Sequence, residues 1–438
     1  MAGHDISEKN VLVLGSYGFI GAEVTRALQA EGARVQGMVR NLALGAKVLP
    51  GVPLTKGDLR TLVHKKDWQG LLVGVDVVVN CAGALQDNAS DDLEAVHHTA
   101  ISALAKACAE RGIGVVQVSA IGAEPDASTH FLRSKAAGDA ALRASGVPLW
   151  VLKPGLVIGQ TDYGGTALLR MLAAVPWVQP LAYPDTPVQS IGMPDLCDVV
   201  ISAVDGRLPQ GRYDLVEDTP HRLSDVVQNT RQWLGFPAAR IGFTVPPVMT
   251  YAVARLADGL AWFGWRSPLR STAMTVMADG VTGDSAPYRA ATGRGFASLP
   301  DIYAAIPCAR EHRLSARMAL LMPLVVATLS LFWLLSGLFG LTGLSTASEV
   351  LTGAGWSAPM AMTSVVFWSL VDIALGLAVL WRPWAARACL AQFGVALFYL
   401  MAASITAPDL WSDPLGPLVK ILPAMILSLV ALPMLASR

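Results

Sequence analysis

The sequence predicts a chain in two parts: a doubly wound parallel α/β sheet with a smaller substrate region, followed by a four-helix transmembrane bundle. The first observation is the uneven charge, because only nine of the 33 basic and 33 acidic residues lie in 317–438. The second is a regular alternation of short apolar strands and helical segments in the first part of the chain. The formal net charge of zero gives no basic surface of the kind that binds nucleic acid, so no such partner is expected.

A glycine-rich turn joins the first predicted strand, 11–14, to a helix that continues to residue 30. Gly15 permits a tight turn, Gly18 lets the backbone approach a pyrophosphate, and Gly21 allows the helix to lie close to the strand. The helix N-terminus offers free N–H groups and the positive end of its dipole to phosphate. The predicted cofactor-binding segment is the run of Gly15, Ser16, Tyr17, Gly18, Phe19, Ile20 and Gly21.

The next strand, 34–39, ends at Arg40. In NAD-selective sites of this kind an acidic residue near this point binds the ribose 2′-hydroxyl, whereas a basic residue suits a 2′-phosphate. Arg40 therefore favours NADP as cofactor over NAD, unless it is simply a solvated charge at the end of a strand.

Further strands and helices alternate along the chain. Strands are predicted at 52–56, 76–80, 114–118 and 149–152, with helices at about 90–111 and 128–145. This order predicts a doubly wound Rossmann sheet, whose ligands lie beyond the carboxyl ends of the strands. Residues 8–155 form the expected NAD(P)-binding domain and 156–312 the substrate region.

The segment 246–268 is rich in Met, Tyr and Trp, with Arg255 and Asp258 interspersed. Two interpretations stay open for it. It is either an amphipathic helix that lies on a membrane surface or a core helix that covers the sheet.

The remaining part, 316–438, contains stretches long and apolar enough to cross a bilayer, which requires about 20 residues of helix. Four such spans are predicted, at about 318–340, 360–381, 388–407 and 418–436.

Basic residues indicate the orientation of the spans. They gather at one end: Arg310, Arg313, Arg317, Arg382, Arg387 and Arg438. The loops 341–359 and 408–417 contain no Lys or Arg. The N-terminus has no apolar run of signal-peptide length, and the five cysteines lack disulfide spacing. We therefore expect a multi-pass protein of the cell (inner) membrane with both termini cytoplasmic.

Asp372 lies in the middle of the second span, where an ionised carboxylate costs about 2.5–3.5 kcal/mol on insertion scales. It is either a proton or quinone contact, or it makes a structural hydrogen bond to a Ser, Thr or Gln on a neighbouring span, such as Gln392 or Ser404.

Residues 10–310 resemble an atypical short-chain dehydrogenase/reductase, of the branch described as NAD-dependent epimerase-like or NmrA-like and related to a complex I accessory subunit. The residues that carry the resemblance are 15–21, 57–59, 80–83, 119–122, 134–135 and 153–155. The C-terminal spans resemble a DoxX-like four-helix membrane domain, and the two parts together are similar to a known fusion.

The resemblance implies roles for individual residues. It places Asp58 and Leu59 at the adenine, and Cys81, Ala82 and Gly83 along the cofactor ribose and phosphates. It places Lys135 on the nicotinamide ribose and Pro154 near the nicotinamide. Ser119, facing the substrate carbonyl, and Lys135 would be the catalytic residues.

One position departs from the family pattern. The family's acid/base is a Tyr four residues before the Lys, and here that residue is Phe131, which carries no titratable proton. His130, Tyr163 and Tyr183 are weaker candidates to supply one.

The adjacent His97 and His98 do not share a helical face, and neither has a partner at metal-ligand spacing. No metal site is therefore expected, although one of the two could face the pocket.

Two functions remain open at this stage. The first is a membrane-anchored NAD(P)(H)-binding oxidoreductase that acts on a lipid or quinone-like substrate with a cytosolic catalytic domain. The alternative is a non-catalytic NADP(H)-binding sensor or assembly factor, which Phe131 favours. A sugar-nucleotide epimerase is a weaker enzymatic option, because it too depends on the missing phenol.

Overall fold

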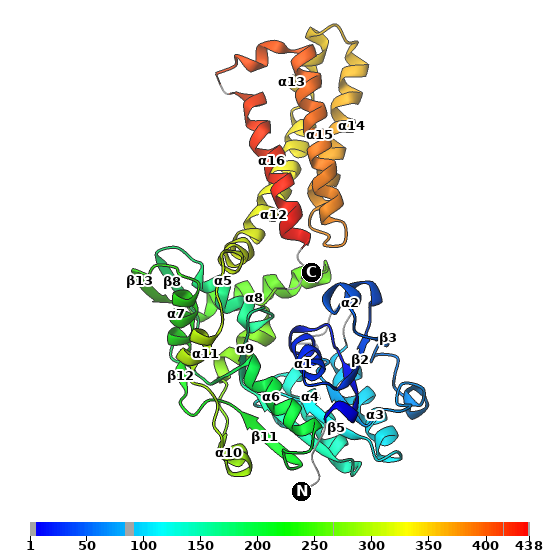
Figure 1. Ribbon diagram of the computed structural model, residues 1–438. Helices are drawn as coiled ribbons and strands as arrows, with labels where there is room; N and C mark the ends of the chain where they lie inside the picture. Colours follow the sequence, from blue (N-terminus) through cyan, green and yellow to red (C-terminus); the bar gives the residue numbers. More distant parts are fainter. Residues whose placement is uncertain (1–5, 84–91, 266, 415, 437–438) are drawn as a thin grey trace. The chain divides into compact units, whose positions relative to one another are not determined.

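The computed structural model describes residues 6–83, 92–265, 267–414 and 416–436 (Figure 1). It divides into two compact units. The α/β unit comprises Met1–Asp258 and Ser267–Arg313, and the helical unit comprises Gly259–Arg266 and Leu314–Arg438.

The α/β unit is built on a seven-stranded sheet with the order β11-β6-β5-β4-β1-β2-β3. All neighbouring strands of this sheet are parallel. The chain builds outward from β1 on one side and from β4 on the other, so the order reverses between these two strands. The prediction of a doubly wound parallel sheet is confirmed. The strands are β1 (Asn10–Leu14), β2 (Arg34–Val39), β3 (Leu54–Lys56), β4 (Val77–Asn80), β5 (Gly114–Val118), β6 (Leu149–Pro154) and β11 (Gly211–Leu215).

Alternate side chains of β1 enter two separate cores, as the period of two along a strand requires. Val11 and Val13 pack in the core that also contains residues of α1 (Phe19–Ala30) and α6 (Met193–Val204). Leu12 and Leu14 pack in the core that contains residues of α3 (Ala100–Ala109) and α4 (His130–Ala144). The sheet is therefore covered on both faces, which explains why its central strands β1 and β4 are almost continuously apolar.

The other elements of the α/β unit surround this sheet. Three further pairings occur outside it: β7 with β10 and β8 with β13 are parallel, and β9 with β12 is antiparallel. The remaining elements are η1 (Ile6–Glu8), α2 (Leu42–Val48), η2 (Lys65–Trp68), η3 (Ala95–Thr99), β7 (Leu156–Ile158), α5 (Gly165–Ala173), β8 (Val178–Leu181), β9 (Pro187–Val188), β10 (Ser190–Gly192), β12 (His221–Arg222), α7 (Leu223–Trp233), β13 (Ile241–Thr244), α8 (Pro247–Trp262), α9 (Ser271–Asp279), α10 (Ala286–Thr292) and α11 (Leu299–Ala305).

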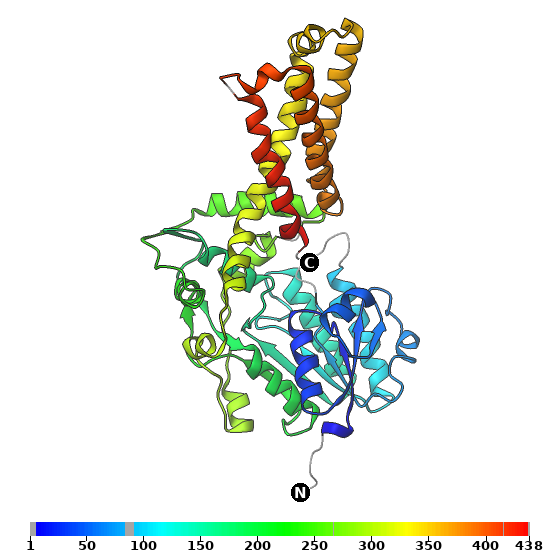
Figure 2. The same cartoon turned by 45° about the horizontal axis from the view of Figure 1, so that its top comes forward.

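The helical unit contains four helices long and apolar enough to cross a membrane, which confirms the predicted membrane part. Figure 2 shows them as neighbouring rods in yellow to red. The first also extends toward the N-terminus through polar residues that precede the predicted span. The elements are α12 (Arg310–Thr342), α13 (Leu344–Gly353), α14 (Ala358–Ala378), α15 (Ala385–Thr406), η4 (Pro408–Trp411) and α16 (Pro417–Ala436).

Small residues let α12 and α14 approach closely. A Cβ on Gly337 would overlap the backbone oxygen of Ser369, and one on Gly376 would lie 2.7 Å from Leu334 Cγ. Such contacts are the usual means of helix packing in a bilayer, where apolar burial alone gives helices no reason to associate.

Candidate cofactor and catalytic site

The turn after β1 has the geometry that its glycines predicted. Gly15 has a φ of +67°, and a Cβ there would lie only 2.8 Å from the Cα of Ala82. A Cβ on Gly21 would overlap the carbonyl oxygen of Gly15. Gly18 is the N-cap of α1 and no side chain caps this end of the helix. This turn, called the cofactor cradle below, therefore fits a diphosphate. Its backbone amides and the positive end of the α1 dipole are not covered by a capping side chain, so phosphate oxygens can approach them.

The other members of this segment differ in orientation. Ser16 is fully buried, and its hydroxyl donates to the carbonyl of Met38 at 3.4 Å, so the side chain points into the protein and leaves only its backbone for a ligand. Phe19 and Ile20 are half-buried and pack against the core beneath α1. Tyr17 is also half-buried.

Two arginines lie where the adenosine end of a dinucleotide is expected. Arg40 is exposed at the end of β2, and its charge acts on Asp58. The second, Arg60, was missed by the sequence analysis. Its Nε lies 3.1 Å from both carboxylate oxygens of Asp58, and the hydrogen bonds to this guanidinium lower the pKa of Asp58. Leu59, which lies between Asp58 and Arg60 in the sequence, is buried.

The residues after β4 are held by the neighbouring strands. The amide of Cys81 donates to the carbonyl of Leu14 at 3.1 Å. The Asn80 side chain accepts from the amide of Ala82 at 3.1 Å and donates to Gln117 at 2.8 Å. Burial raises the pKa of Cys81 to about 12, so its thiol is not a nucleophile at neutral pH.

Ser119 and Lys135 come together although they lie on different elements. Ser119 directly follows β5, and the Lys135 ammonium, from α4, donates to the carbonyl of Val118 at 3.0 Å. A Cβ on Gly83 would lie 3.7 Å from Lys135 Nζ, so the loop after β4 also lies close to the Lys135 ammonium. Pro154 ends β6, the strand next to β5. Burial lowers the pKa of Lys135.

Asp139 completes this group, and the sequence analysis missed it. The Ser119 hydroxyl donates to Asp139 Oδ2 at 2.5 Å. The other oxygen, Oδ1, is buried without a hydrogen-bond partner among the described residues, and Asp139 is only 3% exposed. Burial raises the pKa of Asp139, although the hydrogen bond from Ser119 and the charge of Lys135 oppose the shift. The available signal was its position four residues after Lys135, on the same face of α4.

Phe131 stands beside this group. Its ring centroid lies 5.8 Å from Lys135 Nζ and 5.7 Å from the ring of His97, which it meets edge to face. His97 Nδ1 lies 2.9 Å from the Ser134 hydroxyl, which itself donates to the carbonyl of Phe131 at 3.0 Å. A hydroxyl has one proton, so we assign the proton of the His97–Ser134 bond to Nδ1. Burial, helped by Lys135, holds the pKa of His97 well below its usual range, so the ring is neutral.

The weaker candidates for a proton donor lie at exposed positions. His130 is about half exposed and its Nε2 lies 4.0 Å from Glu94, which also contacts His98 Nδ1 at 2.5 Å. Of the two adjacent histidines, it is therefore His97 that faces the interior. Tyr163 is 46% exposed, and Tyr183 lies at the surface with a φ of 55°.

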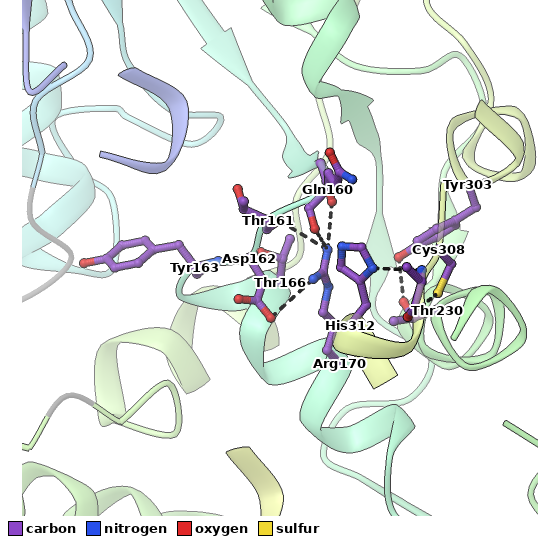
Figure 3. A network of polar contacts seen from close by, with 12 residues as sticks. Gln160, Thr161, Asp162, Tyr163, Thr166, Arg170, Thr230, Tyr303, Cys308 and His312 are labelled. Atoms are coloured by element: carbon purple, nitrogen blue, oxygen red, sulfur yellow. Dashed lines mark hydrogen bonds and ion pairs between the residues drawn. The ribbon is translucent and has the colours of Figure 1, made fainter. Parts of the chain in front are cut away.

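A second polar cluster in the substrate region is centred on Arg170 of α5 (Figure 3). Its guanidinium donates to the carbonyl oxygens of Gly159 at 2.8 Å, Gln160 at 2.9 Å and Thr161 at 3.2 Å. It also lies 3.6 Å from Asp162 Oδ2 and 4.7 Å from the ring centroid of Trp233. Arg170 thus holds the loop after β7, and Figure 3 shows that Tyr163 in this loop points away from the guanidinium.

In the helical unit, Asp372 is buried and both of its oxygens are hydrogen-bonded. Ser336 donates to Oδ2 at 2.8 Å and Tyr399 donates to Oδ1 at 2.7 Å. Ser336 is a serine on a neighbouring span, as the structural interpretation expects, whereas Tyr399 was not predicted. The two residues named as examples bond elsewhere: Gln392 donates to the carbonyl of Leu375 and Ser404 to that of Leu400. The hydrogen bonds favour the structural interpretation of Asp372, with α12 and α15 as the helices it joins to α14.

Comparison with known proteins agrees with this architecture. Residues 15–170 match the NAD(P)H-binding family, and residues 330–429 match the DoxX-like family. The chain is 26% identical over 171 residues to ceramide reductase of Caulobacter vibrioides, a match covering 38% of this chain and 52% of that protein. It is 24% identical over 309 residues to sterol demethylase protein B of Methylococcus capsulatus, covering 64% of this chain and 92% of that protein. The match thus spans about half of the first relative's length.

A third relative and one solved structure extend the comparison. The chain is 23% identical over 248 residues to NADH dehydrogenase [ubiquinone] 1 alpha subcomplex subunit 9 of Arabidopsis thaliana, covering 52% of this chain and 61% of that protein. The Bordetella bronchiseptica enzyme WbmH, solved with NAD+, shares the fold at a TM-score of 0.51 and 16% identity, covering 68% of this chain and 97% of that chain. The chain therefore joins an NAD(P)-binding domain, which shares its fold with an NAD+-bound enzyme, to a domain that matches the DoxX-like family.

Proposed function

We propose that this protein is a membrane-anchored, NAD(P)H-dependent reductase that reduces a carbonyl group of a lipid or quinone-like substrate. The observation that carries the proposal is the buried group of Ser119, Lys135 and Asp139, which retains a proton donor although the family Tyr is Phe131. The names of two relatives, ceramide reductase and sterol demethylase protein B, support a lipid as substrate over a nucleotide sugar.

The cofactor-binding residues follow from the geometry of the strand ends. The amides at the N-terminus of α1 would bind the diphosphate, and the loop of Cys81, Ala82 and Gly83 would line the adjoining ribose. Lys135 would hold the nicotinamide ribose. Arg40 and Arg60 favour the 2′-phosphate of NADP, because guanidinium groups form the strongest hydrogen bonds to phosphate oxygens. When bound, the reduced cofactor supplies a hydride to the substrate carbonyl carbon.

Asp139 would replace the missing phenol as the source of the proton. When substrate is bound, the Ser119 hydroxyl would turn its proton from Asp139 Oδ2 to the carbonyl oxygen of the substrate and accept a hydrogen bond from the protonated Oδ2. Ser119 Oγ then gives its proton to the substrate and takes one from Asp139, which becomes a carboxylate and is later reprotonated from solvent. Lys135 offsets the negative charge that develops on the substrate oxygen and on Asp139. Burial favours this role, because it keeps the Asp139 carboxyl protonated at higher pH than an exposed one.

A second function is favoured by a different observation. The Phe131 ring lies beside Lys135, near the point where the family Tyr would act, and one relative is named as a subunit of an NADH dehydrogenase. These two facts suit a non-catalytic NADP(H)-binding sensor or assembly factor. In either case we propose that the protein lies in the inner membrane with its α/β unit in the cytoplasm, which the basic residues at one end of the spans support.

The two functions are separated by turnover in nanodiscs. The full-length protein is incubated with NADPH and a panel of lipid ketones, lipid aldehydes and short-chain quinones, and NADPH oxidation is followed by absorbance. We expect turnover with at least one lipid carbonyl, and a fall of about 10²–10⁴-fold for Asp139→Asn with NADPH binding kept.

Asp126→Asn, at an exposed position, is the matched control and should keep wild-type turnover. NADPH binding without turnover on any substrate would leave only the sensor or assembly factor.

A further inference from the structure

The fully buried side chains of helix α8 are all small. Its buried residues recur three and four positions apart, so they form a single narrow face. They are Thr250, Ala254, Ala257 and Ala261. A helix that covers a sheet in a soluble core buries large apolar residues instead, so the interpretation as a core helix does not account for α8.

The opposite face of α8 is apolar and open. Trp262 is 84% exposed, Val248 80% and Leu256 66%. The same face carries Met249, Tyr251 and Val253, all exposed. Its charged member is Arg255, which stacks on Tyr251 and lets its alkyl stem lie along the apolar surface. A helix whose outer face contacts water carries charged and polar residues on that face, whereas α8 carries large apolar residues there.

The neighbouring strand continues the apolar surface. Ile241 and Phe243 of β13, two residues apart and therefore on one face of the strand, are 62% and 49% exposed. The strand pairs with β8, and Trp177 directly before β8 accepts backbone hydrogen bonds from residues 240 and 241. Trp177 is 69% exposed and adopts a φ of 60°, an unfavourable conformation for an aromatic residue.

The charge of this region complements an anionic surface. Residues 240–270 contain four arginines and one aspartate, and this Asp258 contacts Arg270 at 3.1 Å. Basic residues beside a membrane are attracted to anionic lipids, which favours a lipid occupant over a neutral protein face.

The C-terminal end of α8 is continuous with the membrane part. The residues that follow it belong to the helical unit and pack on the turn between α14 and α15. The indole of Trp265 donates to the carbonyl of Leu380 at 2.6 Å, and the amide of Arg382 donates to that of Phe263 at 2.9 Å. This turn lies at the basic end of the spans, which is the cytosolic end by the distribution of Lys and Arg.

We propose that the exposed face of α8, with Ile241, Phe243 and Trp177, lies in the headgroup region of the cytosolic leaflet as an in-plane amphipathic helix. The occupant of this surface is the bilayer itself. The proposal does not depend on the reductase activity, since it rests on exposure, charge and the attachment of α8 to the α14–α15 turn.

The test is photolabelling of the full-length protein in nanodiscs that contain anionic phospholipid and a phospholipid with a diazirine at the start of one acyl chain. Labelled peptides are located by mass spectrometry. We expect label on α8 and β13 comparable to that at the ends of α14, the positive control. The surface loop around Val73, an exposed apolar residue outside this face, should carry none.

Matched variants separate lipid contact from non-specific labelling. Leu256→Glu combined with Trp262→Glu should abolish label on α8, whereas Val73→Glu should leave it unchanged; all three side chains are exposed, so folding is not at issue. The proposal is wrong if the ends of α14 are labelled and α8 is not.

Discussion

Replacement of Gly15 by alanine tests the cofactor cradle most directly. Gly15 has a φ of +67°, so an alanine there is strained by about 1–2 kcal/mol. Its Cβ would also lie 2.8 Å from Ala82 Cα, and ordinary contact begins at 3.4 Å, so the loops after β1 and β4 must separate by about 0.6 Å. Because both loops would line the same dinucleotide, we expect NADPH affinity to fall about tenfold or more, equivalent to about 1.4 kcal/mol.

The control for Gly15→Ala is Gly74→Ala. Gly74 has a φ of +71°, and nothing lies within 4 Å of an added Cβ, so this variant carries the same backbone strain without the collision. Without cofactor, Gly15→Ala should lose more thermal stability than Gly74→Ala because it adds the collision, and only Gly15→Ala should also lose binding. The assay is NADPH fluorescence enhancement, with thermal protection by saturating NADPH as a second readout. Equal NADPH affinity in Gly15→Ala, Gly74→Ala and the wild type would refute the assignment of the cradle.

The remaining predictions concern single side chains. Phe131→Tyr restores a phenol beside Lys135, and we expect increased NADPH oxidation with lipid carbonyls; unchanged rates would show that the pocket does not use this position. Asp139 donates only when protonated and its folded pKa is raised, so turnover should be present at low pH and lost as the pH rises through that pKa, and Asp139→Asn should remove this limb of a pH–rate profile. Arg40→Ala combined with Arg60→Ala should weaken NADPH binding more than NADH binding, as measured by paired titrations; an equal loss would place the 2′-phosphate elsewhere. Asp372→Ala removes the carboxylate that accepts from the Ser336 and Tyr399 hydroxyls and should cost about 1–3 kcal/mol of unfolding free energy in detergent, whereas Asp372→Asn should cost less.

Local sequence patterns were sufficient to predict the architecture of the chain. The glycine turn, the apolar strands and the four long apolar stretches are each encoded within about 20 consecutive residues, and the structure contains all three. The grouping of Ser119 with Lys135 was expected from the family resemblance, and the structure brings the two together where α4 packs beside the end of β5.

The hydrogen-bond partners of buried polar groups could not be predicted from local sequence patterns. Asp139 could be placed on the face of Lys135, but its contact with Ser119 joins residues 20 positions apart through the packing of α4 on β5. Asp372 accepts hydrogen bonds from Ser336 and Tyr399 because the rotation of each helix about its axis decides which side chains meet in the bundle. Hydropathy alone does not specify this rotation.

The sequence by itself determined the order of the elements, the cofactor turn and the membrane spans, since periodicity and glycine conformations are local properties of the chain. Only the tertiary structure decided which face of α8 is open and that Asp139 lies under Ser119, with one carboxylate oxygen lacking a partner among the described residues. The physical reason is that burial and hydrogen bonding depend on contacts between distant segments, which side-chain packing selects after the local elements have formed.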